Sequence, residues 1–163
     1  MPDMAIIRKR NEHKKITNLT MNYNQIIKYF GDIAAAHPFI NRFGSGDISD
    51  IDSISDRYGL FPILWVVPQS VNIGENTLTY KFRFMVFDID NTDDSHQQEI
   101  LSDTLSTFLD VVKTFITIDP SIDLEYNNEA YPFTERFTDY LCGWYGDLSI
   151  ITELDNNPCD IAE

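Results

Sequence analysis

At 163 residues, the chain is long enough for one domain whose core needs neither disulfides nor metals. Its hydrophobic fraction of 43% and aromatic fraction of 13% indicate a folded protein and exclude general disorder. No stretch approaches the roughly 18 apolar residues of a membrane-spanning helix, and no secretory signal follows the basic N-terminus. We therefore expect synthesis in the cytoplasm and no membrane partner.

The formal net charge of −14 is distributed unevenly. Residues 1–20 lack apolar periodicity and are predicted to be a flexible basic arm, either a disordered extension or a docking segment. From Ile16 onward, seven basic residues stand against twenty-four acidic ones, a balance of −17. This acidic body argues against a nucleic-acid-binding surface, but it suits the wall of a conduit through which DNA slides. The arm contains Arg8, Lys9, Arg10, Lys14 and Lys15.

Apolar residues at spacings of three and four predict a first helix from about Tyr23 to Ala36, ended by Pro38. We interpret His37, at its end, as a capping or packing residue and not as a catalyst. The glycines and aspartates of residues 43–52 then predict a loop.

Within and after this loop, Asp50, Asp52 and Asp56 weakly resemble a calcium-binding loop. The central glycine and the terminal glutamate of such loops are missing, so we expect no metal there.

Two strands are predicted next. Leu60–Val67 is short and apolar, with Pro62 near its start, and Thr77–Ile89 is long and alternates. Residues 68–76, which include Gly74, are predicted to be a turn-rich connection. The pair is therefore expected to form an antiparallel hairpin with one drier face.

A second helix is predicted to begin at Asp93 or Asp94, with Gln97 and Glu99 in its first turn. Its broad apolar stripe, from Ile100 to Ile116, is expected to pack across the sheet. Strands are predicted to follow at Ile122–Tyr126, Tyr131–Tyr140 and Cys142–Leu154. The order predicts one α+β domain over residues 21–163, a mostly antiparallel sheet of four or five strands with a long helix across it and an N-terminal helix.

The sequence lacks a phosphate-binding glycine loop, a histidine-based zinc motif and a serine nucleophile elbow. Cys142 and Cys159 have no partners at metal-ligand spacing, and we interpret them as free thiols. Trp65 and Trp144 lie in apolar strands, where they are expected to pack in the core or at an interface. We assign no catalytic, cofactor-binding or metal-binding residue.

One motif offers an enzymatic alternative. Asp88, Asp90 and Thr92 resemble the Asp-x-Asp-x-Thr signature of haloacid-dehalogenase-type phosphatases, which would make the chain a magnesium-dependent phosphohydrolase. That signature ends a buried parallel strand, whereas this strand carries Lys81 and Arg83 and follows another strand closely. A helix-capping cluster explains the acids without chemistry.

Five stretches occur in a characteristic order: Tyr58–Val66, Phe84–Asp88, Glu99–Leu105, Asp139–Trp144 and Pro158–Cys159. This order resembles that of small neck and tail-completion proteins of tailed phages, including tail-terminator-like proteins, and above all structural proteins of crAss-like and other Bacteroidetes phages. The similarity covers about Met21 to Cys159 and leaves out the basic arm.

The resemblance implies a non-enzymatic virion protein made in the host cytoplasm, a ring-forming subunit of the neck or tail that lines the DNA conduit. Such rings are commonly sixfold in tail terminators and twelvefold in neck connectors, and they contact portal-adaptor, neck or tail proteins. Head-to-tail interfaces must close the ring, and strand edges, the 68–76 hairpin and the termini are the candidate contacts. A third hypothesis, from the charge alone, is an acidic inhibitor that mimics DNA.

Overall fold

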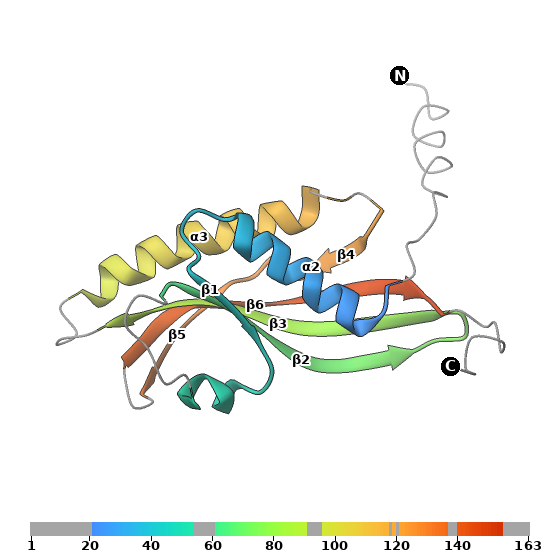
Figure 1. Ribbon diagram of the computed structural model, residues 1–163, viewed down its shortest axis with the longest axis horizontal. Coiled ribbons are helices and arrows are strands. Elements are labelled where there is room, and N and C mark those ends of the chain that lie inside the picture. Colours follow the sequence, from blue (N-terminus) through green and yellow to red (C-terminus); the bar gives the residue numbers. More distant parts are fainter. Residues whose placement is uncertain are drawn as a thin grey trace, which may run out of the picture.

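The computed structural model describes residues 21–53, 61–90, 96–117, 119, 121–136 and 140–154. They form an α+β fold built on a six-stranded mixed sheet in the order β1-β2-β3-β6-β4, in which β5 also pairs with β6. Helices α2 and α3 lie on one face of the sheet, and a short 3-10 helix, η1, lies on the other (Figure 1). The elements are α2 Tyr23–Ala36, β1 Arg42–Ser45, η1 Ile48–Ser53, β2 Ile63–Ile73, β3 Thr77–Asp90, α3 Gln97–Thr117, β4 Asp123–Tyr126, β5 Tyr131–Arg136 and β6 Tyr140–Glu153.

The predicted α+β class and the mostly antiparallel sheet are confirmed. Every strand pair is antiparallel except β1 with β2. Strand β6 pairs with β3 along its whole length, and its other edge is shared by β4 and β5. The β2–β3 hairpin was expected, but six strands are present where four or five were predicted.

Helix α2 has the predicted bounds. Asn22 and Gln25 form a reciprocal capping box at its start, with hydrogen bonds of 3.0 and 2.8 Å. At its end, His37 is the C-cap residue and donates its backbone N–H to Ala34 O. The capping role predicted for His37 is therefore confirmed.

Helix α3 crosses the sheet as predicted, with Glu99 in its first turn. The expected apolar stripe was too broad, because Leu109 and Ile116 are exposed. Thr104 and Thr107 are buried instead. Each hydroxyl donates a hydrogen bond to the carbonyl four residues earlier, so it is not left unsatisfied in the core. Asp93 and Asp94 lie outside the described residues.

An aromatic cluster joins the helices to the centre of the sheet. The rings of Phe84 in β3 and Phe108 in α3 stack with centroids 4.6 Å apart. Phe30 of α2 contacts Phe115 of α3 at 5.0 Å and Phe82 of β3 at 5.4 Å, both edge to face. All five rings are buried, so this cluster fixes α2 and α3 on the same face of the sheet.

The connection predicted at residues 68–76 is wrong for most of its length. Strand β2 continues to Ile73, and only residues 74–76 turn. A register shift between Pro68 and Ser70 absorbs the proline, and the hairpin continues beyond it.

The loop predicted at residues 43–52 is also wrong in part, because it contains β1 and most of η1. β1 runs parallel to β2, and the ring of Trp65 lies against Gly44 so closely that a Cβ at this glycine would be 2.1 Å from the ring.

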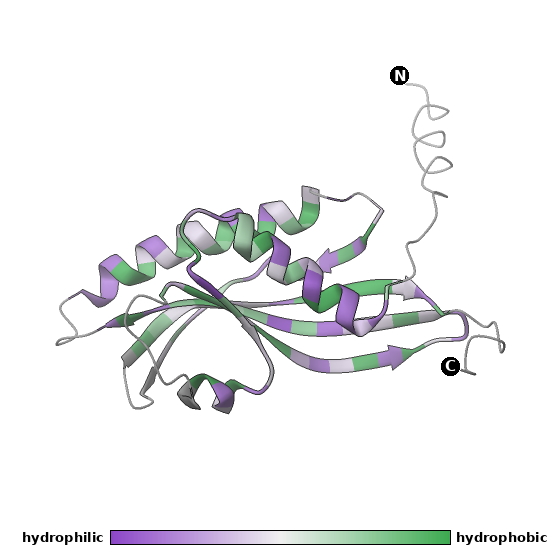
Figure 2. Cartoon of the chain, viewed as in Figure 1, coloured by the Kyte–Doolittle hydropathy of each residue, from purple (hydrophilic) through white to green (hydrophobic). Residues whose placement is uncertain are grey.

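The described residues cover only part of the sheet face opposite the two long helices. Ile51 of η1 packs there on a second apolar cluster, whose members include Trp65, Met85, Phe87 and Leu141. Toward the β2–β3 turn, hydrophilic and hydrophobic residues interleave along both strands (Figure 2). We call this uncovered, mixed part the open face.

We predict that Phe108→Ala lowers the free energy of unfolding by about 3–5 kcal/mol, because it empties the centre of the aromatic cluster. Leu109→Ala, the neighbouring position on the exposed side of α3, should cost less than about 1 kcal/mol. Urea denaturation followed by circular dichroism measures both. Equal losses would show that α3 is not held through Phe108.

Candidate functional site

The turn of the β2–β3 hairpin presents two apolar side chains to solvent. We call residues 70–76 the hairpin tip. Val71 is 46% exposed and Ile73 is 78% exposed, the largest value among the exposed large apolar residues of the described chain. The turn is held by Gly74 N–H donating to Thr77 O at 2.8 Å and Leu154 N–H donating to Asn76 O at 2.9 Å. The tip is therefore a defined protrusion with an apolar end.

The strand edge that leads to the tip is unpaired in the described part of the chain. β1 pairs only with Ile63–Val66, and no described strand pairs with the outer edge of β2 from Val67 to Ile73. At the opposite edge of the sheet, the outer edges of β4 and β5 have no described partner strand. Unpaired edges offer backbone groups that a neighbouring chain can complete. The bulge and Pro68 limit such pairing on β2 to the part nearest the tip.

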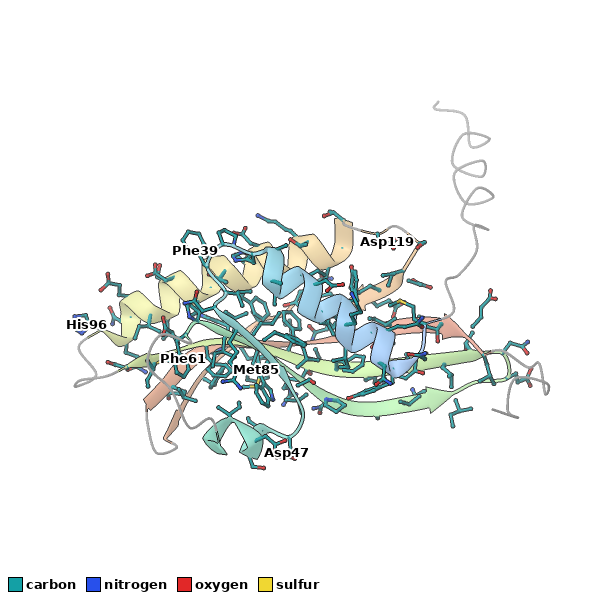
Figure 3. The ribbon with its side chains drawn as sticks, viewed as in Figure 1. Phe39, Asp47, Phe61, Met85, His96 and Asp119 are labelled. Atoms are coloured by element: carbon teal, nitrogen blue, oxygen red, sulfur yellow. The ribbon has the colours of Figure 1, made fainter. Side chains whose placement is uncertain are left out.

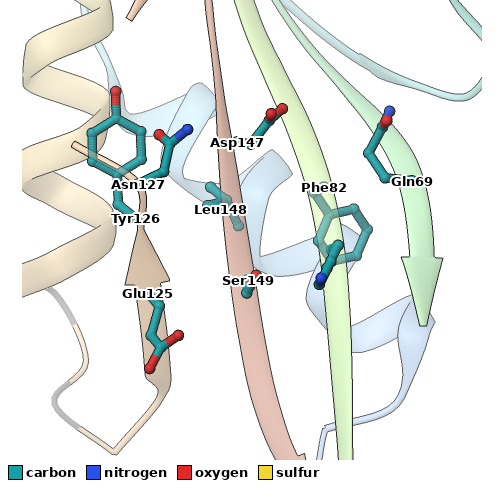
Figure 4. A pocket seen from close by; sticks show the side chains of 9 residues that line it. Gln69, Phe82, Glu125, Tyr126, Asn127, Asp147, Leu148 and Ser149 are labelled. Carbon is teal, nitrogen blue, oxygen red and sulfur yellow. The ribbon is translucent and has the colours of Figure 1, made fainter. Parts of the chain in front are cut away.

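A shallow groove of about 450 Å³ crosses the open face over β3, β6 and β4 (Figure 4). At the border of the groove, Arg83 forms a bidentate ion pair with Asp147, in which Nε and Nη2 donate to the two carboxylate oxygens at 2.8 and 3.1 Å. The guanidinium carbon of Arg83 lies 4.5 Å from the ring centre of Tyr145. The hydrogen bonds to Asp147 raise the pKa of Arg83. The groove is lined by Gln69, Lys81, Phe82, Glu125, Tyr126, Asn127, Asp147, Leu148 and Ser149.

The two aspartates of the phosphatase-like motif lie on the helix-covered face of β3. They pair antiparallel with Cys142 and Tyr140 of β6, so the strand is not the parallel strand that the signature requires. Asp88 is half-buried and Asp90 is buried. Burial raises the pKa of Asp88, and the nearby charge of Asp103 adds to the shift. In the described ranges, no three His, Cys, Asp or Glu side chains are placed to hold a metal ion.

Asp50 of the calcium-like loop and Asp47, three residues before it, bond to nearby backbone groups. Asp47 accepts hydrogen bonds from the N–H and hydroxyl of Ser49 at 2.8 and 2.7 Å, which lowers the pKa of Asp47. Asp50 accepts from Asp47 N–H at 3.1 Å. These bonds form an Asp turn at the start of η1. Asp56 lies outside the described residues.

The remaining candidate residues have packing roles. Trp65 is buried and donates its indole N–H to Gly46 O at 3.3 Å, and Trp144 donates to Leu101 O at 2.8 Å. The packing predicted for both tryptophans is confirmed. Cys142 is buried and forms no disulfide in the described part of the chain, as predicted, and Cys159 lies outside the described residues.

A comparison with protein-family models found no match, and a search of curated proteins found no similar protein. None of the described helices is long and apolar enough to cross a membrane. The functional argument therefore depends on the residues and their arrangement.

The pKa of Asp88 gives a prediction for stability. A raised pKa means that the folded state binds the proton more tightly than the unfolded state, so stability falls as the pH rises through the folded pKa. Asp88→Asn removes this loss and keeps the acceptor for Ile89 N–H. We expect its Tm to exceed the wild-type value at pH 7 by on the order of 2 °C, because solvent screens a half-buried carboxylate, and to match it near pH 3.

Thermal melts at the two pH values measure this difference. Asp123→Asn, at an exposed carboxylate on β4, reports the general effect of removing one negative charge. The same pH dependence in both variants would contradict a specific role for the burial of Asp88.

Proposed function

We propose that this chain is a non-enzymatic structural protein of a tailed-phage virion, a ring-forming subunit of the neck or tail with a tail-terminator-like fold. The observation that carries the proposal is the hairpin tip, an ordered protrusion that exposes Val71 and Ile73. In a monomer, these two β-branched apolar side chains at the end of the hairpin stay in contact with water. A neighbouring subunit that covers them gains their burial, about 25 cal/mol for each Å² of apolar surface removed from water.

The arrangement of the sheet suits a closed ring. A ring needs head-to-tail contacts between two different surfaces of the same subunit. The outer edge of β2, next to the tip, and the outer edges of β4 and β5 lie on opposite sides of one sheet. A contact between these two edges of neighbouring subunits repeats in one direction, and it gives a closed ring when the rotation between neighbours divides a full turn. The resemblance to tail terminators and neck connectors favours six or twelve copies.

The acidic body supports the second part of the proposal, that DNA passes through the ring without sequence-specific binding. The open face carries Asp123, Glu125 and Asp147 against Lys81 and Arg83, and Arg83 is paired with Asp147. A wall with excess negative charge repels the phosphate backbone and prevents sticking. Neighbouring neck, portal-adaptor or tail proteins are the further proposed partners, and the virion is the proposed location.

We predict that the purified full chain has a mass of six or twelve subunits, and that Val71→Asp together with Ile73→Asp shifts it to the monomer. Burying two carboxylates at a subunit contact is far too costly for the contact to persist. Size-exclusion chromatography with light scattering gives the masses, and negative-stain microscopy shows the rings.

The matched control is Ile116→Asp, which places a carboxylate at an exposed apolar position on α3, away from the tip. It should assemble like the wild type, and circular dichroism should show that all variants are folded. Rings that persist in the double variant would contradict a role for the hairpin tip.

A magnesium-dependent phosphohydrolase using Asp88 and Asp90 remains the alternative, because Asp88 lines a groove and has a raised pKa. The antiparallel pairing of β3 argues against it. We expect no magnesium-dependent hydrolysis of a phosphomonoester by the full chain above the background of Asp88→Asn. Hydrolysis that the substitution abolishes would favour the enzyme.

A further inference from the structure

A second groove, of about 380 Å³, lies between α3 and the end of β3. We call it the acidic groove. Its walls combine the apolar surfaces of Phe39 and Pro62 with the carboxylates of Asp88, Asp103 and Asp110. Phe39 is 65% exposed, and it stands beside the helices in Figure 3. The remaining lining residues are Thr104, Ser106 and Thr107.

The charge of this groove is strongly one-sided. No lysine or arginine is among its described lining residues. Asp103 and Asp110 are exposed on α3, and the ring Nε2 of His37 lies 3.8 Å from a carboxylate oxygen of Asp110. Burial is the main cause of the raised pKa of Asp88, and the negative charge of Asp103 adds to it. A cationic segment with some apolar surface would complement both kinds of wall.

The chain itself contains such a segment before the first described residue. Residues 6–15 read Ile-Ile-Arg-Lys-Arg-Asn-Glu-His-Lys-Lys, so two apolar residues precede five of the twelve basic residues of the chain. The seven others are spread over the following 148 positions. The segment therefore has the chemistry that the acidic groove lacks.

The length of the chain allows this segment to reach the groove. The 14 residues of α2 span about 21 Å, from Tyr23 to Ala36, after which His37 lies 3.8 Å from Asp110 and Phe39 follows. Lys15 precedes Tyr23 by eight residues, which extend to about 28 Å. The basic residues at positions 8–10 are farther from Met21 and reach along the groove.

We propose that residues 6–15 dock in the acidic groove of their own chain, with the basic side chains against Asp88, Asp103 and Asp110 and the isoleucines against Phe39 and Pro62. Charge complementarity selects the site, and the chain length favours the groove of the same molecule. Because the contacts are largely between exposed charges, docking is strong at low salt and is weakened by screening.

Photo-crosslinking in the full chain tests the docking. A benzoylphenylalanine placed at His13, between the two basic clusters, should crosslink to the tryptic peptides that contain Phe39 or residues 103–110. The product should have the mass of a monomer. Asp103→Asn with Asp110→Asn should lower the yield about fivefold, the range for two exposed ion pairs, and 1 M salt should lower it similarly.

The control for net charge is Asp123→Asn with Glu125→Gln, which removes two exposed carboxylates on β4 and should leave the yield unchanged. Three results would overturn the proposal. They are crosslinks to other peptides, a product with the mass of a dimer, and equal losses in the groove and control variants.

Discussion

The stacking of Phe84 in β3 on Phe108 in α3 holds the long helix across the middle of the sheet, and the other features follow from it. Phe115, about two turns later in α3, contacts Phe30 and so positions α2 beside it. With both long helices on one face, η1 is the only described helix on the opposite face, and it lies away from the β2–β3 turn. The open face is thus a consequence of where this aromatic contact places the helices.

The same arrangement separates the surfaces that the proposals use. The hairpin tip lies beside the start of α2, where Tyr23 and Val71 line one small hollow, whereas the acidic groove lies at the other end of that helix. An apolar protrusion and an acidic groove at different places give the subunit a direction, which a head-to-tail ring requires. Docking of residues 6–15 would neutralise the groove and leave the tip free.

Much of the fold could be predicted because its residues repeat with a clear period. The bounds of α2 and the pairing of β3 in a hairpin follow from such patterns. Pro68 misled the prediction, because a bulge accommodates it within an edge strand. β1 could not be predicted from the sequence, because glycine has no preference for strands. Gly44 is needed there because the ring of Trp65 leaves no room for a Cβ. The acidic groove could not be predicted either, because Phe39, Asp88 and Asp103, which line it, come from three separate segments of the sequence.

The most direct test of the account is a cryo-electron microscopy reconstruction of the purified full chain. The account predicts a closed ring in which each hairpin tip lies against the next subunit, with Ile73 buried and an acidic surface facing the lumen. A ring whose tips point into solvent, or whose lumen is neutral or basic, would contradict it. A single subunit at every protein concentration would remove the hairpin tip as a contact between copies.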